Sequence, residues 1–137
     1  MKIKYQILKE KKLLILSYSG HFDPREYLIH VAETTSLPAW KDVSKILSDF
    51  THLILSYDKK IIDQLIQTKE QLNIQNKTHV YLVKTPMETA LLHLYIKKTG
   101  EKNYNYYSTL ENALVYLNLA EDRNSIAEIL TKMRQEL

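Results

Sequence analysis

Residues Thr78–Pro86, THVYLVKTP, give the clearest indication of the fold class. Its four consecutive apolar residues, Val80–Val83, predict a strand that is covered on both faces, so we expect it at the centre of a sheet. Thr85 can cap a helix, and Pro86 suits the first helical position because its missing N–H would have no partner there. A strand that leads directly into a helix is typical of an α/β sheet with parallel strands.

The alternation of strand and helix continues outward from this stretch in both directions. Hydrophobic spacing and capping residues predict strands at 3–7, 13–19, within 43–50 and at 104–107, and helices at 24–37, from 56 or 58 onward, at 86–99, at 109–119 and from 122 onward. The first two strands form a hairpin, so the sheet is mixed but mostly parallel. We therefore expect an α/β domain over residues 1–119, with residues 120–137 adding an amphipathic C-terminal helix to the same unit.

Composition excludes several classes of function. The chain has 137 residues, which corresponds to one domain, and it has no cysteine, so disulfides and thiolate metal sites are excluded. Its two glycines, Gly20 and Gly100, cannot form a phosphate-binding loop. No two histidines have the i, i+4 spacing of a helical zinc site. We therefore expect neither a cofactor nor a metal.

Charge and hydropathy limit the kinds of partner and the cellular compartment that we expect for this protein. The net charge is only +3, and basic and acidic residues are mixed along the chain, which argues against nucleic acid. No apolar run approaches the length of about 18 residues that a membrane span needs. The first fifteen residues alternate between polar and apolar, unlike a signal peptide. The sequence therefore predicts a cytoplasmic protein without an integral membrane segment.

Four segments carry a resemblance to a known family. They are LLILSYSGHFDPREY at 13–27, PAWK leading into ILSDF at 38–50, THVYLVKTP at 78–86, and TLENAL at 109–114. Together they resemble the STAS-like domains, the group related to the anti-anti-sigma factor SpoIIAA, over roughly residues 1–119. The resemblance implies a sheet backed by helices, and binding or regulation instead of catalysis.

The resemblance also points to a phosphorylation site. Well-known members carry a serine in an Asp-Ser-x-Gly turn after the third strand, where a partner kinase phosphorylates it. The similar stretch here is Asp49–His52, in which the carboxylate is kept, a phenylalanine takes the place of the serine, and the glycine is missing. Thr51 is the nearest hydroxyl and is therefore the predicted site of phosphorylation.

Ligands of open α/β sheets sit beyond the carboxyl ends of the strands. Those ends supply candidate residues for binding a ligand or partner, namely His21, Asp49, Thr51, His52 and Lys84. Such a set can hold an anion or a polar small molecule, although Asp49 can equally well bond its own loop backbone. Catalysis is not expected, because Thr51 and His52 are neighbours whose side chains would point apart in an extended segment.

Two hypotheses of function follow. In the first, the chain is a regulatory module whose recognition edge is formed by residues 49–56 and the second helix. In the alternative, it is a carrier or sensor of a small apolar or amphipathic ligand, held between the sheet and the helices near Trp40 and Tyr81. The C-terminal helix can pack on its own domain or cover a partner or a second copy, which would make a homodimer. The tyrosines of 104–107 suit either a partly wet edge strand or an interface.

Overall fold

A computed structural model describes residues 1–56, 58–72, 76–100 and 102–137. The strands are β1 Lys2–Leu8, β2 Leu13–His21, β3 Lys45–Ile54, β4 Thr78–Leu82 and β5 Tyr104–Tyr107. The α-helices are α1 Pro24–Thr35, α2 Lys59–Leu72, α3 Pro86–Thr99, α4 Leu110–Tyr116 and α5 Arg123–Glu136. Short 3-10 helices cover Lys9–Lys11, Pro38–Asp42 and Ala120–Asp122.

The strands form one sheet in the order β1-β2-β3-β4-β5. The pair β1–β2 is antiparallel, whereas β2, β3, β4 and β5 run parallel to one another. The predicted mixed, mostly parallel sheet is therefore confirmed. Strand β4 lies inside the sheet between β3 and β5, although the middle position belongs to β3. Strand β5 is an edge strand, with Tyr104 buried and Tyr106 and Tyr107 half-buried.

Capping residues explain where the helices begin and end. The Asp23 carboxylate accepts hydrogen bonds from the first amides of α1, and Pro24 follows it. Before α3, Thr85 and Glu88 form a reciprocal capping box. Gly100 ends α3 with a φ of 66°, in the left-handed region that favours glycine. These boundaries agree with the sequence because caps depend on residues that are close along the chain.

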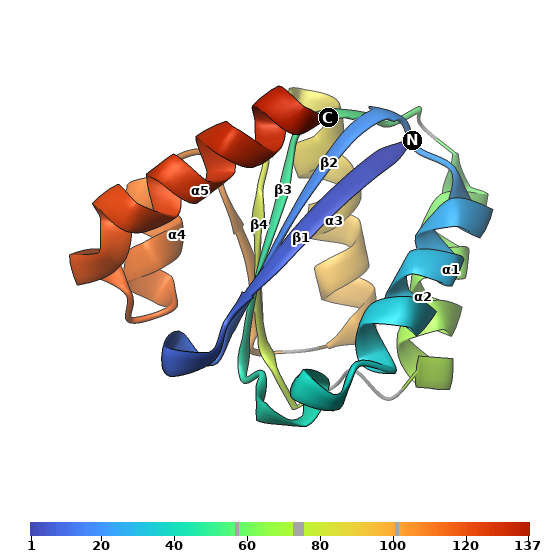
Figure 1. Cartoon of the computed structure of the whole chain (residues 1–137). Helices are drawn as coiled ribbons and strands as arrows, with labels where there is room; N and C mark the ends of the chain where they lie inside the picture. The colour runs from blue at the N-terminus through green and yellow to red at the C-terminus, as the bar shows by residue number, and fades with distance from the viewer. Residues whose placement is uncertain (57, 73–75, 101) are drawn as a thin grey trace.

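Helices cover both faces of the sheet and make three layers (Figure 1). Helices α1, α2 and α3 lie on one face, and α4 and α5 lie on the other. The core on the α1–α3 face is rich in aromatic side chains: Tyr18, Tyr27, Phe50, Tyr81, Tyr95 and Tyr104. The core on the α4–α5 face is aliphatic: Leu13, Ile15, Leu47, Val80, Leu82, Leu114, Leu117, Ile126, Leu130 and Met133.

Helix α5 packs on its own domain, which is the first of the two placements considered for it. Ile126, Leu130 and Met133 are all buried against the sheet and α4. These positions are spaced at i, i+4 and i+7, so one stripe of the helix faces the core. Burial of this stripe removes its apolar surface from water without a second chain.

Strand β3 is longer than the sequence predicts. Residues 49–52 were expected after the strand, but the pairing with β2 continues through them to Ile54. The register shifts on the way, because Ser17 pairs with Asp49 whereas Ser19 pairs with His52. Three residues of β3 thus advance against two of β2, which is a β-bulge. The bulge reverses the alternation of side chains, so that Phe50 and Leu53 both face the aromatic core.

Candidate functional site

Asp49 is the only aspartate or glutamate of β3, and its side chain is fully buried on the α4–α5 face. The Nε of Arg134, near the end of α5, donates to the carboxylate at 2.7 Å. The Ser17 hydroxyl of β2 donates to the same oxygen at 3.0 Å. A carboxylate taken out of water is costly unless it is paired and hydrogen-bonded. Asp49 therefore ties the C-terminal helix to the centre of the sheet.

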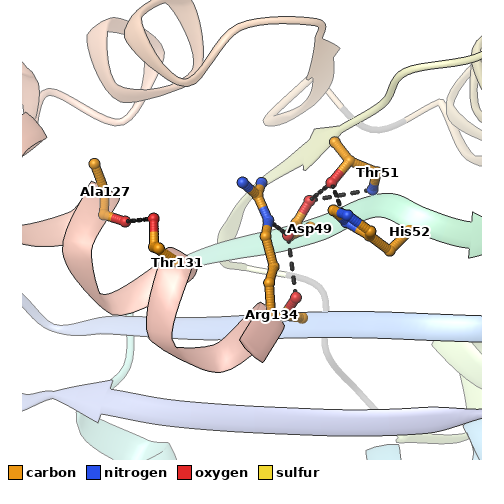
Figure 2. Close-up of polar contacts among 7 residues, drawn as sticks. Asp49, Thr51, His52, Ala127, Thr131 and Arg134 are labelled. Carbon is orange, nitrogen blue, oxygen red and sulfur yellow. Dashed lines mark hydrogen bonds and ion pairs between the residues drawn. The ribbon is translucent and has the colours of Figure 1, made fainter. Parts of the chain in front are cut away.

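The bulge adds Thr51 and His52 to this group (Figure 2). The Thr51 hydroxyl donates to the second Asp49 oxygen at 2.6 Å, and the Thr51 backbone N–H donates to it at 3.1 Å. The Nδ1 of His52 lies 3.1 Å from the Thr51 hydroxyl. The two neighbouring side chains were expected to point apart. They meet because the bulge interrupts the regular alternation of the strand.

The Asp49 carboxyl stays ionised well into the acidic range. Burial alone would raise its pKa, because the charged form loses solvation. Hydrogen bonds from Arg134 and Thr51, together with the charge of Arg134, outweigh burial and lower the pKa below its ordinary value of 3.8. The pair is thus a fixed negative and a fixed positive charge at neutral pH.

A pocket of about 410 Å³ opens beside this group, between α5 and the carboxyl ends of β3 and β4. Its polar wall includes Thr51, His52, Lys84, Ser108, Thr131 and Arg134. Its apolar wall includes Leu82, Val83, Leu110, Ala127 and Leu130. The position agrees with the rule that open α/β sheets bind ligands beyond the carboxyl ends of their strands.

The structure brings only some of the predicted site residues together. Thr51, His52 and Lys84 line the one pocket. Asp49 lies beneath that pocket as a buried partner of Arg134 and is not on an exposed rim. His21 lines a separate pocket with Phe22, Asp23 and Arg25 at the start of α1, so it does not join the others. In the register of the two parallel strands, Ser19 pairs with His52, so His21 lies two residues further along, opposite Ile54. The chain then continues from His21 into α1, which covers the opposite face of the sheet from the pocket beside α5.

Sequence reasoning missed Arg134 and Ser17. Arg134 is 85 positions from Asp49, and only the packing of α5 brings the two together. One signal was present, since Arg134 follows Leu130 by one helical turn and so borders the apolar stripe of α5. Ser17 gave a second signal, because it alternates with Leu13 and Ile15 on one face of β2 and is fully buried.

A second buried polar group lies on the opposite face of the sheet. The Nε2 of His79 is 2.8 Å from the Ser48 hydroxyl, and its Nδ1 is 3.3 Å from the Tyr81 hydroxyl. Burial lowers the pKa of His79 to about 3, so the imidazole is neutral at physiological pH. Tyr81 stacks on His79 at 4.1 Å between ring centroids, and the group is enclosed in the aromatic core.

Two kinds of functional feature are absent from the described residues. They contain no group of three or more histidine, aspartate or glutamate side chains placed to hold a metal ion. No helix among them has both the length and the apolar character that crossing a membrane would require.

Comparison with known proteins gives a fold and no close relative. No protein-family model matches the chain, and no curated protein sequence matches it. Among solved structures, the crystal structure of an anti-sigma factor antagonist from Mycobacterium paratuberculosis is similar, with a TM-score of 0.58 and 16% sequence identity. The match covers 85% of this chain and 95% of that chain. The chain therefore has the STAS-like fold of an anti-sigma factor antagonist, as the resemblance of its sequence implied.

Proposed function

We propose that this chain is a non-catalytic regulatory module that binds another protein through residues 49–56 and α2. The observation that carries the proposal is the fold shared with a protein described as an anti-sigma factor antagonist. The end of β3 supports it, because His52, Ile54 and Ser56 are exposed there. Ile54 is 51% exposed, and an apolar side chain beside polar neighbours suits a protein contact.

Thr51 is the hydroxyl we propose for phosphorylation within this surface. It is half-buried, and its hydroxyl is 2.6 Å from the Asp49 carboxylate. A phosphoryl group there would remove the hydrogen bond and place a second anion beside Asp49. The phosphoryl oxygens would then compete with Asp49 for Arg134. Phosphorylation would thus act on the bond between β3 and α5 as well as on the exposed surface.

A photo-crosslinking amino acid placed at Ser56 tests the protein contact. The matched control is the same amino acid at Val115, which is 65% exposed on α4. In the native cells, we expect a discrete crosslinked band from position 56 and none from position 115. Equal bands from both positions, or no band from either, would contradict the proposed surface.

Phosphorylation needs its own measurement. Mass spectrometry of the chain purified from native cells should locate a phosphate on Thr51, and Thr51→Val should abolish it. A phosphate that persists in Thr51→Val, or an unmodified Thr51 in every growth condition, would remove this residue from the proposal.

The small-ligand alternative is favoured by a specific observation, the pocket of about 410 Å³ beside α5. This is not the expected place near Trp40 and Tyr81. Tyr81 packs against Phe50, His79 and Tyr95 in the closed aromatic core. A ligand is therefore better placed on the other face of the sheet, in the pocket beside α5, which has one polar and one apolar wall.

A further inference from the structure

We propose that the pocket beside α5 binds a small organic anion, with a phosphate or carboxylate head held by Arg134 and Lys84 and an apolar body against Leu110 and Leu130. The inference rests on the small-ligand candidate and not on the protein contact proposed above, although Thr51 and His52 belong to both places. It specifies the pocket in which the ligand binds, the chemical class of the ligand and the residues that hold it.

Arg134 is a cation held in position for a ligand. Its Nε is bound to Asp49, and Figure 2 shows its two terminal nitrogens pointing away from that carboxylate. Neither terminal nitrogen has an acceptor among the described residues, and the side chain lines the pocket. Asp49 and Ser17 are fully buried, so they fix the guanidinium without competing for the ligand. A planar guanidinium with two adjacent N–H groups matches the oxygens of a phosphate or carboxylate.

Lys84 supplies a second cation from a different element. It is the second residue after β4, its side chain is exposed, and it lines the same pocket. Its backbone N–H donates to Glu88, but its ammonium group forms no ion pair with any part of the chain that the structure describes. None of the described residues around the pocket is acidic. The wall is therefore electropositive, while the compensating negative charge of Asp49 lies behind Arg134.

The hydroxyls of the wall play a smaller part. The hydrogen of Thr51 is donated to Asp49, and that of Thr131 is donated to the Ala127 carbonyl at 2.9 Å (Figure 2). A hydroxyl has only one hydrogen to donate, so neither can donate to an anion in this arrangement. Of the hydroxyls of the wall, only that of Ser108 remains for an anion, so recognition of the charge depends mainly on the guanidinium and the ammonium.

The size and the apolar wall exclude an inorganic ion as the best ligand. A volume of about 410 Å³ lies within the range of roughly 300–1,000 Å³ found for pockets that bind small organic molecules. Leu110, Ala127 and Leu130 offer apolar surface on the side of α4 and α5. A ligand gains from this surface only if it carries an apolar body next to its charged head.

Phenyl phosphate and benzoate are suitable probes because each joins an anionic head to a flat apolar ring. Each is titrated into the whole 137-residue chain at 0.15 M ionic strength, with inorganic phosphate and benzyl alcohol as the incomplete probes. Two-dimensional amide NMR follows binding. We expect phenyl phosphate or benzoate to shift the amide signals of Lys84, Ala127 and Thr131, and to bind at least tenfold more tightly than either incomplete probe.

Lys84→Gln is the decisive variant because this exposed side chain is not part of the fold. Its matched control is Lys132→Gln, the same change of charge at an exposed position of α5 outside the pocket. A hydrogen bond between charged groups is worth enough to change affinity by about tenfold. We therefore expect about tenfold weaker binding in Lys84→Gln and less than a twofold change in Lys132→Gln.

Several results would overturn the proposal. Equal affinity for inorganic phosphate and phenyl phosphate would show that the apolar wall takes no part. If benzyl alcohol bound as tightly as phenyl phosphate and benzoate, the cations Arg134 and Lys84 would take no part in binding. Equal losses in Lys84→Gln and Lys132→Gln, or no binding of any probe, would refute a defined site. None of these results bears on the crosslinks from position 56, so the two proposals fail separately.

Discussion

A buried polar group lies on each face of the sheet: on the α1–α3 face, His79, Ser48 and Tyr81 form a neutral group among aromatic rings, whereas on the α4–α5 face a carboxylate and a guanidinium meet among aliphatic side chains. His79, Ser48 and Tyr81 satisfy one another within a closed core. Arg134 lines a pocket and its side chain is one-third exposed, while its partner Asp49 is fully buried beneath it. The first arrangement serves packing alone, while the second leaves a held cation facing an open space.

The difference follows from the cost of burying charge. A neutral imidazole can be closed off completely once its nitrogens have partners, whereas an ion is costly in a fully dry place. An ion pair is therefore tolerated best where one partner keeps contact with water or with a ligand. Four measurements test whether charge and burial distinguish the two groups in this way.

The largest of the expected effects is the loss of stability in acid caused by His79, the buried imidazole on the α1–α3 face. The pKa of His79 is lowered to about 3 by burial, while the unfolded chain takes up a proton near its ordinary value of 6.5. The unfolded state thus binds more protons between these values, and the free energy of unfolding falls as the pH drops, by up to about 1.4 kcal/mol per pH unit. The contribution is fully present above pH 6.5 and lost towards pH 3.

Urea denaturation at pH 7, 6, 5 and 4 measures this slope. His79→Gln keeps a polar group but cannot titrate, so its stability should change less with pH over the same range. Comparison of the two slopes separates His79 from Asp49, whose lowered pKa confines its own loss of stability to more acidic pH. Parallel curves for the two proteins would contradict the neutral state of His79.

Removal of the cation should be the next largest effect. Arg134→Met leaves the Asp49 carboxylate buried without its charge partner, and breaking a buried pair in this way costs about 3 kcal/mol. The double variant Asp49→Asn with Arg134→Met should recover part of the loss, because no charge remains buried. Denaturation of the two single variants and the double variant measures the coupling. Additive losses would show that the two side chains do not depend on each other.

The next prediction compares matched hydroxyl deletions on the two faces. Thr51→Val removes a hydrogen bond to a carboxylate, so we expect a loss of about 2 kcal/mol in the free energy of unfolding. Tyr81→Phe removes a longer hydrogen bond to a neutral imidazole, so we expect about 1 kcal/mol or less. Chemical denaturation of both variants tests the order. A larger loss in Tyr81→Phe would contradict the expectation that a hydrogen bond to a carboxylate contributes more than one to a neutral imidazole.

An exposed ion pair should contribute least. Lys4 of β1 lies 3.8 Å from Glu136 of α5, and both side chains are about half exposed. Exposed pairs are screened by water and salt, so Lys4→Gln should cost less than about 0.5 kcal/mol. The same denaturation measurement applies. A loss as large as that of Arg134→Met would mean that burial does not decide the strength of the pair at Asp49.

The fold was predictable where its causes are local. Thr85 caps α3 as predicted, Glu88 completes the capping box, and Gly100 ends that helix in a left-handed conformation. The apolar run of 80–83 is buried inside the sheet. The end of β3 was not predictable, since the segment 51–55 has no clear alternation and the bulge depends on pairing with β2. The position of α5 was likewise not predictable, because its apolar stripe could have packed either on the sheet or on another chain.

The candidate site was predictable only in part. His52 and Lys84 were expected near one another because parallel strands end at the same side of the sheet, and both line the pocket. It stays a proposal that His52, Lys84 and the other predicted residues bind a ligand or partner. His21 was expected with them, but it lies at the start of α1 in a different pocket. No pattern within β3 could reveal that its aspartate is held by a residue of the last helix.

The order of strands and helices, the caps and the parallel sheet could be read from the sequence, because these depend on periodicity and on residues a few positions apart. The partner of Asp49, the contact between Thr51 and His52, and the pocket beside α5 became visible only in the folded chain. The groups that form them are far apart along the chain or depend on pairing between strands. A carboxylate and a guanidinium 85 residues apart become a pair only when the burial of an apolar stripe has fixed the helix that carries one of them.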